Sequence, residues 1–163
     1  MISTPDLCDE HGDAVQVAAP VFRHYGAIVN FGGQVATIKC HEDNSLVAEA
    51  VKSPGKGRIL VVDGGGSVRR SLLGDNLAAK AVENGWSGIL IFGALRDVEE
   101  IAPMQLGVLA LASIPRKTQK RGEGQTGVSL NFAGITINDG DYLYADLTGV
   151  IVSTVRLTTR TAG

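Results

Sequence analysis

The middle of the chain alternates short aliphatic runs with amphipathic stretches. Residues 58–63, 88–92 and 108–112 are almost continuous apolar runs, which is typical of strands that are buried on both faces. Between them, residues 77–84 carry apolar side chains at helical spacing, and residues 96–101 predict a second, shorter helix. The order strand, helix, strand, helix, strand predicts neighbouring parallel strands joined by right-handed crossovers.

The pattern before this centre predicts one more strand and two helices. Residues 33–40 alternate apolar and polar side chains, as a half-buried strand does. Polar residues 43–45 can cap a helix that continues to Val51. A short N-terminal helix is expected at residues 4–8, where Pro5 suits the first turn.

The last third of the chain has the period of antiparallel strands. Residues 128–132, 134–137, 142–144 and 149–155 are the expected strands, and residues 138–141 (NDGD) form a turn. We therefore expect an α/β fold with a mixed sheet, parallel at its centre and antiparallel in its C-terminal strands.

Length, charge and cysteine content narrow the class of protein. The 163 residues, 44% of them hydrophobic, suit a single domain over residues 1–163, with a polar tail at 156–163 that is expected to be frayed from Thr158 onward. A formal net charge of −2 argues against nucleic acid as a direct partner. Cys8 and Cys40 form no CxxC pair, the N-terminus lacks the pattern of a secretory signal, and no apolar run reaches the roughly 18 residues of a membrane span. We expect a cytoplasmic protein that does not contact membranes.

Two turns that follow buried strands hold the candidate chemistry. Ligands of parallel sheets bind outside the carboxyl ends of the strands, so the turns at residues 74–77 (GDNL) and 96–97 (RD) are expected to face one crevice. Amides at the start of the helix after Gly74 suit a carboxylate. Arg96 can clamp a carboxylate or keto oxygen, and Asp97 is a hard ligand for Mg²⁺ or Mn²⁺. Locally, a plain helix cap and a solvated ion pair explain the same residues.

Longer motifs resemble one known family. The chain has GDNLA followed by RD, with Asp75 and Arg96 separated by 21 positions, and it has TIKCHEDN at residues 37–44, GRILVVDGGGSVRRSLLGDNLA at 57–78 and INDGDYLYADLTGVIV at 137–152. These motifs resemble the family of small class II pyruvate aldolases that includes the regulator of ribonuclease E activity A. The resemblance covers roughly residues 4–155.

The resemblance implies a fold, an assembly and an activity. The fold is a β/β/α swivelling-type sandwich, usually assembled as a homotrimer. The activity is a lyase activity on pyruvyl oxoacids, which cleaves 4-hydroxy-4-methyl-2-oxoglutarate into two pyruvates or decarboxylates oxaloacetate with a divalent metal cation. Gly74, Asp75, Asn76 and Leu77 would hold the pyruvyl carboxylate, Asp75 would also position water on the metal, Arg96 would bind the keto oxygen and act in catalysis with Asp75, and Asp97 would ligate the metal.

Both reactions leave a pyruvate enolate, whose negative charge Arg96 and the metal can stabilise. A Schiff-base route would need a desolvated lysine, and Lys39, Lys52, Lys56 and Lys80 lack such a context. Longer aldolases of the family supply a C-terminal glutamate that this sequence does not show, which favours decarboxylation over aldol cleavage. Glu42, Asp43 or water on the metal are the candidate general bases.

Other polar groups have simpler explanations. The neighbours His41, Glu42 and Asp43 point in different directions along a turn, which disfavours a shared metal. The GGGS at residues 64–67 lacks the spacing of a nucleotide site or of a methyltransferase cofactor site. We expect the basic residues 117–121 to form a solvated loop, Trp86 to be a packing or interface anchor, and His11 and His24 to be structural.

A function of another class is also consistent with the resemblance. The namesake of the family regulates an RNA-degrading enzyme by protein contact, so a non-catalytic inhibitor of ribonuclease E is the alternative. An intact Gly74 to Leu77 turn and an intact Arg96–Asp97 pair favour the lyase.

Overall fold

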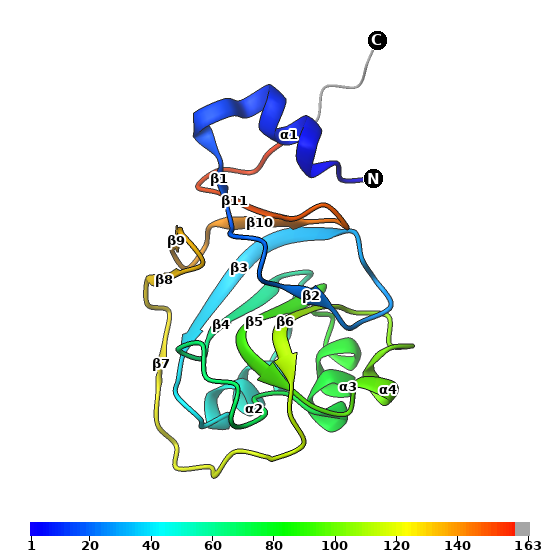
Figure 1. Ribbon diagram of the computed structural model, residues 1–163, viewed down its shortest axis with the longest axis vertical. Coiled ribbons are helices and arrows are strands. Elements are labelled where there is room, and N and C mark those ends of the chain that lie inside the picture. Colours follow the sequence, from blue (N-terminus) through cyan, green and yellow to red (C-terminus); the bar gives the residue numbers. More distant parts are fainter. Residues whose placement is uncertain (159–163) are drawn as a thin grey trace.

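The computed structural model describes residues 1–158 (Figure 1). Its helices are α1 (Thr4–His11), α2 (Ser45–Lys52), α3 (Asp75–Glu83) and α4 (Val98–Ile101), with a 3-10 turn at Gly12–Ala14. Its strands are β1 (Gln16–Val17), β2 (Arg23–His24), β3 (Phe31–Lys39), β4 (Ile59–Asp63), β5 (Gly88–Leu95), β6 (Gly107–Ser113), β7 (Gln125–Thr126), β8 (Leu130–Phe132), β9 (Ile135–Ile137), β10 (Tyr142–Ala145) and β11 (Val150–Ser153).

One curled, mixed sheet organises the molecule. Its strand order is β1-β11-β10-β3-β4-β5-β6-β2, with β7 pairing β3 off this path. The pairs β3–β4, β4–β5 and β5–β6 are parallel, whereas the strands toward both edges pair antiparallel. The predicted α/β fold with a parallel centre and antiparallel C-terminal strands is therefore confirmed.

Within residues 1–158, apolar side chains fill three cores around this sheet. The largest lies between the central strands and the helices α2, α3 and α4, which cover the same face (Figure 1). A second core lies under the separate β8–β9 hairpin on the other side of β4. The third joins α1 to β10 and β11 and includes Leu7, Tyr144 and Ile151. Because β4 is buried along its whole length between two of these cores, its continuous apolar run has a physical cause.

The main elements lie where the pattern predicted them, with corrections at their ends. The first helix, whose start was expected in residues 4–8, continues to His11. The fourth helix begins at Val98 rather than Arg96, because Asp97 has a left-handed backbone (φ 59°, ψ 44°). Residues 130–137 form an isolated hairpin instead of joining the main sheet. The strands β1, β2 and β7 were not predicted, since two residues are too short to show a period.

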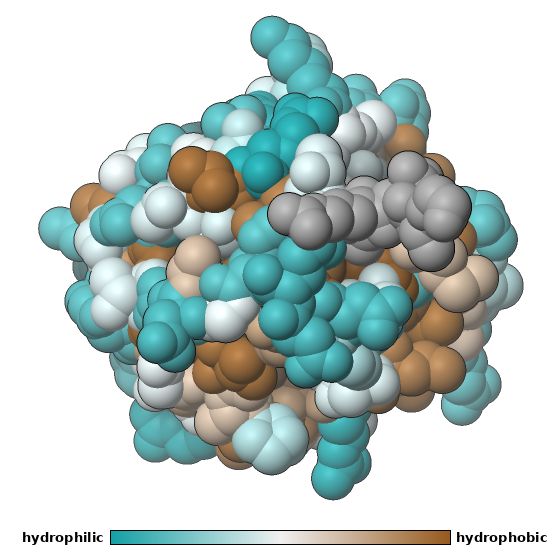
Figure 2. Space-filling model, turned by 90° about the horizontal axis from the view of Figure 1, so that it is seen from above, coloured by the Kyte–Doolittle hydropathy of each residue, from teal (hydrophilic) through white to brown (hydrophobic). Residues whose placement is uncertain are grey.

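The tail is only partly the polar segment that the sequence predicts. Leu157 is buried in the third core, and its amide donates a 2.7 Å hydrogen bond to the Tyr144 hydroxyl, so the prediction of a polar tail from residue 156 onward is wrong at this position. Residues 159–163 lie outside the described part of the chain. Figure 2 views the face that carries α1, where apolar patches are separated by polar side chains. Within residues 1–158, no helix is long and apolar enough to cross a membrane.

Trp86 packs inside the molecule, so of its two predicted roles, packing anchor or interface anchor, it has the first. It is 4% exposed within the largest core, and its indole N–H donates to the carbonyl of Ser53 at 3.1 Å. The Arg58 guanidinium lies 4.9 Å from the centre of the ring. Gly55 has to be glycine here, because a Cβ at this position would lie 2.5 Å from the backbone nitrogen of Trp86.

Candidate active site

The chain path after β4 brings the two predicted turns together. After a loop, residues 71–73 run alongside the end of β5: the Leu72 amide donates to Ala94 O at 2.9 Å, and the Arg96 amide donates to Leu73 O at 2.9 Å. These ladder hydrogen bonds place Gly74 beside Arg96 at the carboxyl edge of the parallel strands. The crevice expected at this edge is therefore present.

Asp97 is the centre of this arrangement. Its Oδ2 accepts the Asp75 amide at 2.9 Å and lies 3.9 Å from Nε of Arg96. The left-handed backbone of Asp97 turns the chain sharply after β5, and Asp is one of the few residue types that tolerate this conformation. Strained backbone of this kind is common at functional sites. The side chains of Arg96 and Asp97 are 39% and 32% exposed, so both are accessible to a ligand.

Gly74 is required by close approach rather than by its backbone angles. Its φ of −123° suits any residue. A Cβ at this position would lie 2.8 Å from Oδ2 of Asp97 and 3.4 Å from Nε of Arg96. The glycine thus lets the carboxylate and the guanidinium sit directly over the start of α3.

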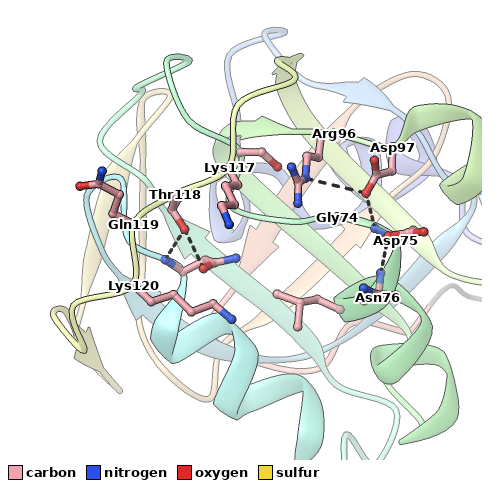
Figure 3. Close-up of a pocket in the computed structure, with 12 residues that line it drawn as sticks. Gly74, Asp75, Asn76, Arg96, Asp97, Lys117, Thr118, Gln119 and Lys120 are labelled. Atoms are coloured by element: carbon pink, nitrogen blue, oxygen red, sulfur yellow. Dashed lines mark hydrogen bonds and ion pairs between the residues drawn. The ribbon is translucent and has the colours of Figure 1, made fainter.

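These groups line one cavity of about 510 Å³, within the range of small-molecule sites (Figure 3). It includes every residue predicted for the site: Gly74, Asp75, Asn76, Leu77, Arg96 and Asp97. Residues 117–120 form the facing wall, and Asn44 and Ser71 complete the lining. As expected, residues 117–121 form a loop in which all side chains but that of Thr118 are exposed, and residues 117–120 of this loop also line the cavity. The sequence feature that could have indicated this place in the cavity is the position of the loop after β6, at the same carboxyl edge of the sheet.

The amides at the start of α3 can donate hydrogen bonds to carboxylate oxygens, although two of them already donate to carboxylates of the protein. The Asp75 amide donates to Asp97, and the Asn76 amide donates to Oδ1 of Asp75 itself at 2.8 Å. Helix starts attract anions because their amides point outward and their dipole is positive there. A substrate carboxylate at this end would lie next to, or displace, carboxylates that the protein supplies.

Glu42 and Asp43 do not reach this cavity as general bases. They line a neighbouring cavity of about 230 Å³ with His41. Hydrogen bonds from Arg69 and then Ser67 lower the pKa of Glu42 to about 2. Burial raises the pKa of Asp43, but hydrogen bonds from Ser45 and from the amides of residues 121 and 123 outweigh it and lower this pKa to about 2. Carboxylates with so low a pKa are poor bases at neutral pH.

The glycine loop at residues 64–67 satisfies its own amides. The amides of Gly64 and Gly66 donate to Phe92 O, the Gly65 amide donates to the Asp63 side chain, and the Ser67 amide donates to Gly64 O. A phosphate-binding loop would point these amides at the ligand instead. None of these residues lines the larger cavity, and neither do His11, His24 and the four lysines rejected above for a Schiff base.

A family model described as RraA-like, Aldolase/RraA, matches residues 4–152. The chain belongs to this family. It is 61% identical over 150 residues to a protein of Ectopseudomonas mendocina named "Putative 4-hydroxy-4-methyl-2-oxoglutarate aldolase", and the match covers 92% of this chain and 93% of that one. A protein of the same name from Pseudomonas fluorescens Pf-5 is 59% identical with 92% of both chains covered.

Two solved structures of this fold are close to the chain. One, from Thermus thermophilis, is described as the RNA-processing inhibitor RraA; it has a TM-score of 0.95 and 38% identity, and the match covers 100% of this chain and 99% of that one. The other, from Geobacillus kaustophilus, is described as an S-adenosylmethionine:2-dimethylmenaquinone methyltransferase. It has a TM-score of 0.95 and 43% identity, with 99% and 100% covered. Such different names on one fold mean that function has to be inferred from the site.

Proposed function

We propose that this protein is a divalent-metal-dependent carbon–carbon lyase acting on pyruvyl oxoacids. It would cleave 4-hydroxy-4-methyl-2-oxoglutarate into two pyruvates, decarboxylate oxaloacetate, or do both. One observation carries the proposal: the Asp97 carboxylate, the Arg96 guanidinium and the start of α3 converge in one cavity. The names of the aldolase relatives support the same reaction class.

The carboxylates present fit Mg²⁺ or Mn²⁺ in a water-rich site. Within residues 1–158, no group of three or more His, Cys, Asp or Glu side chains gathers to enclose a metal ion. Mg²⁺ does not need such a cage, because it usually keeps several waters and binds one or two carboxylates plus substrate oxygens. The hydrogen bond from the Asp75 amide and the 3.9 Å ion pair with Arg96 both fall on Oδ2 of Asp97, so Oδ1 remains available for a cation, and Asp75 lies next to Asp97.

The remaining roles follow from charge and position. The pyruvyl carboxylate binds at the amides of residues 74–77, and Arg96 donates to the keto oxygen, where negative charge develops as the C3–C4 bond breaks. A divalent cation held by Asp97 would supply further positive charge that stabilises the enolate. Asp75 positions water near the substrate. Because Glu42 and Asp43 are excluded as bases, water within the cavity is the remaining acceptor for the hydroxyl proton of an aldol substrate.

The direct test uses Asp97→Asn. Asparagine tolerates the left-handed backbone, so the fold should survive while the anionic ligand is lost. We expect pyruvate release from at least one of the two substrates, and we expect this release to need Mg²⁺ or Mn²⁺, to stop with excess EDTA, and to fall at least about 100-fold in the variant. Wild-type turnover that EDTA does not reduce, or a fully active variant, would contradict the proposal. Circular dichroism checks that the variant is folded.

A regulatory role is the second candidate, because the Thermus structure of this fold is described as an RNA-processing inhibitor. Contact with ribonuclease E would then use the surface and not the cavity. RNA cleavage by purified ribonuclease E, with and without wild-type protein or Asp97→Asn, tests this role. Inhibition by both proteins would support a regulator, and undiminished cleavage would contradict it.

Assembly as a homotrimer is also a proposal. The exposed apolar side chains of Val17 and Leu147, 59% and 77% exposed, lie at one apolar groove and would be covered by a partner subunit. Sedimentation equilibrium should then give three times the 17.0 kDa mass of the chain. A monomer at micromolar concentration would contradict this assembly.

A further inference from the structure

The wall that faces Arg96 and Asp97 carries two lysines that the proposed mechanism does not use. Figure 3 shows the side chains of Lys117 and Lys120 on the opposite side of the cavity from Asp75, with Thr118 and Gln119 between them in the chain. Neither lysine forms an ion pair with a carboxylate of the described residues. Two unpaired cations therefore border a cavity whose other side binds a pyruvyl head.

The backbone of this wall is fixed in place. Ser71 donates its amide to Arg116 O at 2.7 Å, and the Arg70 guanidinium donates to Lys117 O at 3.1 Å. Thr118 is buried, and its hydroxyl donates to the side-chain oxygen of Asn44 at 2.7 Å. Asn44 in turn donates to Leu72 O. The wall is thus tied to the same 71–74 segment that presents Gly74, which sets the distance between the two sides of the cavity.

Charge around the cavity supports an anionic ligand with more than one carboxylate. Although the chain has a formal net charge of −2, six of its cations lie in two short segments at this edge. They are Arg69, Arg70, Arg116, Lys117, Lys120 and Arg121. Only Arg69 among them is paired with a carboxylate of the described residues, namely Glu42. Of the six, Lys117 and Lys120 line the cavity, and together with Arg96 they set three cations against the two carboxylates of Asp75 and Asp97 there. This excess of positive charge attracts anionic ligands.

We propose that Lys117 and Lys120 bind the distal carboxylate of the substrate and so restrict this enzyme to pyruvyl dicarboxylates. This proposal rests on the proposed function, since the pyruvyl carboxylate is placed at the start of α3. Both lysines are exposed, which suits ion pairing with a ligand and does not suit Schiff-base chemistry, because that needs a desolvated amine.

The position of these cations has different consequences for the two reactions. In aldol cleavage, the C4 hydroxyl loses its proton, the C3–C4 electron pair moves to C3 to form the enolate, and the distal carboxylate remains an anion on the second pyruvate. In decarboxylation, the same bond breaks but the distal carboxylate leaves as neutral CO₂. The lysines therefore assist binding of both substrates. They hold the distal carboxylate equally in the ground state and in the transition state of cleavage, whereas they oppose decarboxylation, in which the charge they pair with is lost.

The binding test separates this proposal from the lyase activity. The probes are 2-oxoglutarate and 2-oxopentanoate, which share the same head and differ only in a distal carboxylate or methyl group. Isothermal titration calorimetry with Mg²⁺ present should show that wild type prefers 2-oxoglutarate, and that this preference falls about 10-fold or more in the double variant K117M/K120M. Lys117→Arg should retain most of it. The matched control is Lys52→Met, because Lys52 lies on the exposed surface of α2, outside the cavity.

An unchanged preference in the double variant, or an equal loss for both probes, would overturn the proposal. Because no turnover is needed, this result can be read even if the protein cleaves neither substrate, which would be the separate failure of the proposed function. Kinetics give a second readout in an active enzyme. The double variant should have a raised KM for oxaloacetate without a lower kcat, whereas a matching loss of kcat would place the lysines at the reacting head and overturn the assignment.

Discussion

Replacing Gly74 with alanine should damage catalysis while leaving the fold almost unchanged. The added Cβ would lie 2.8 Å from Oδ2 of Asp97, so that the carboxylate has to retreat by about 0.6 Å to reach the 3.4 Å of an ordinary contact. It cannot rotate away without lengthening its 2.9 Å hydrogen bond from the Asp75 amide. A misplacement of about 1 Å costs roughly 100-fold in rate, so we expect kcat/KM to fall about 10- to 100-fold.

The stability of this variant should change little because two effects oppose each other. At φ −123° alanine is unstrained, and it lowers the entropy of the unfolded chain by about 0.4–1 kcal/mol in favour of folding. Weakening one hydrogen bond to a carboxylate costs about 1.5–3 kcal/mol at most. The free energy of unfolding measured in urea should therefore fall by no more than about 2.6 kcal/mol.

The assay follows pyruvate formation from oxaloacetate through lactate dehydrogenase and NADH, with the rate without enzyme subtracted. The matched control is Gly149→Ala, because a Cβ at Gly149 meets no atom within 4 Å. Activity of Gly74→Ala within twofold of wild type would show that the position of the Asp97 carboxylate does not limit the reaction. Unfolding of the variant would instead show that the contact cannot relax locally.

Two further substitutions test the hydrogen bonds that hold the 117–123 segment beside the cavity. Asp43 has a folded-state pKa of about 2, below the roughly 3.9 of an unfolded aspartate, so its stabilising effect is complete above pH 4 and is lost as the pH falls toward 2. Asp43→Asn should lower the free energy of unfolding by about 1–3 kcal/mol at pH 7 and reduce the further loss of stability that urea unfolding shows as the pH falls. An unchanged loss at acid pH would exclude Asp43 as its source. Thr118→Val removes the hydroxyl bonded to Asn44 and should cost about 1–3 kcal/mol while raising KM for oxaloacetate; unchanged KM with lost stability would show that this anchor serves the fold alone.

The sequence was sufficient for the centre of the fold because each element there has its own pattern. The β4 run is apolar throughout since both faces are buried, and α3 ends where Gly85 adopts a φ of 79°. The edges of the sheet were harder to predict from the sequence. Strands of two residues have no period, and no local pattern shows that residues 130–132 and 135–137 pair with each other apart from the main sheet.

The site was predictable on one side only. The GDNL and RD turns follow buried strands and match a family motif, so their convergence could be expected from the sequence. The facing wall could not, because the KTQK segment has no motif and its place depends on the ladder from Ser71 to Arg116 and on Thr118 meeting Asn44. Likewise, the sequence alone left Glu42 and Asp43 as possible bases, and only their hydrogen bonds exclude them.

The central claim is that Arg96 and Asp97 form and stabilise a pyruvate enolate. Its most direct test is the exchange of pyruvate methyl protons for deuterium in D₂O, followed by proton NMR with Mg²⁺ and with excess EDTA. The account predicts metal-dependent exchange in wild type that falls at least about 100-fold in both Arg96→Lys and Asp97→Asn. Absence of exchange in folded wild-type protein with metal present would contradict this claim, and so would exchange in either variant that is as fast as in wild type.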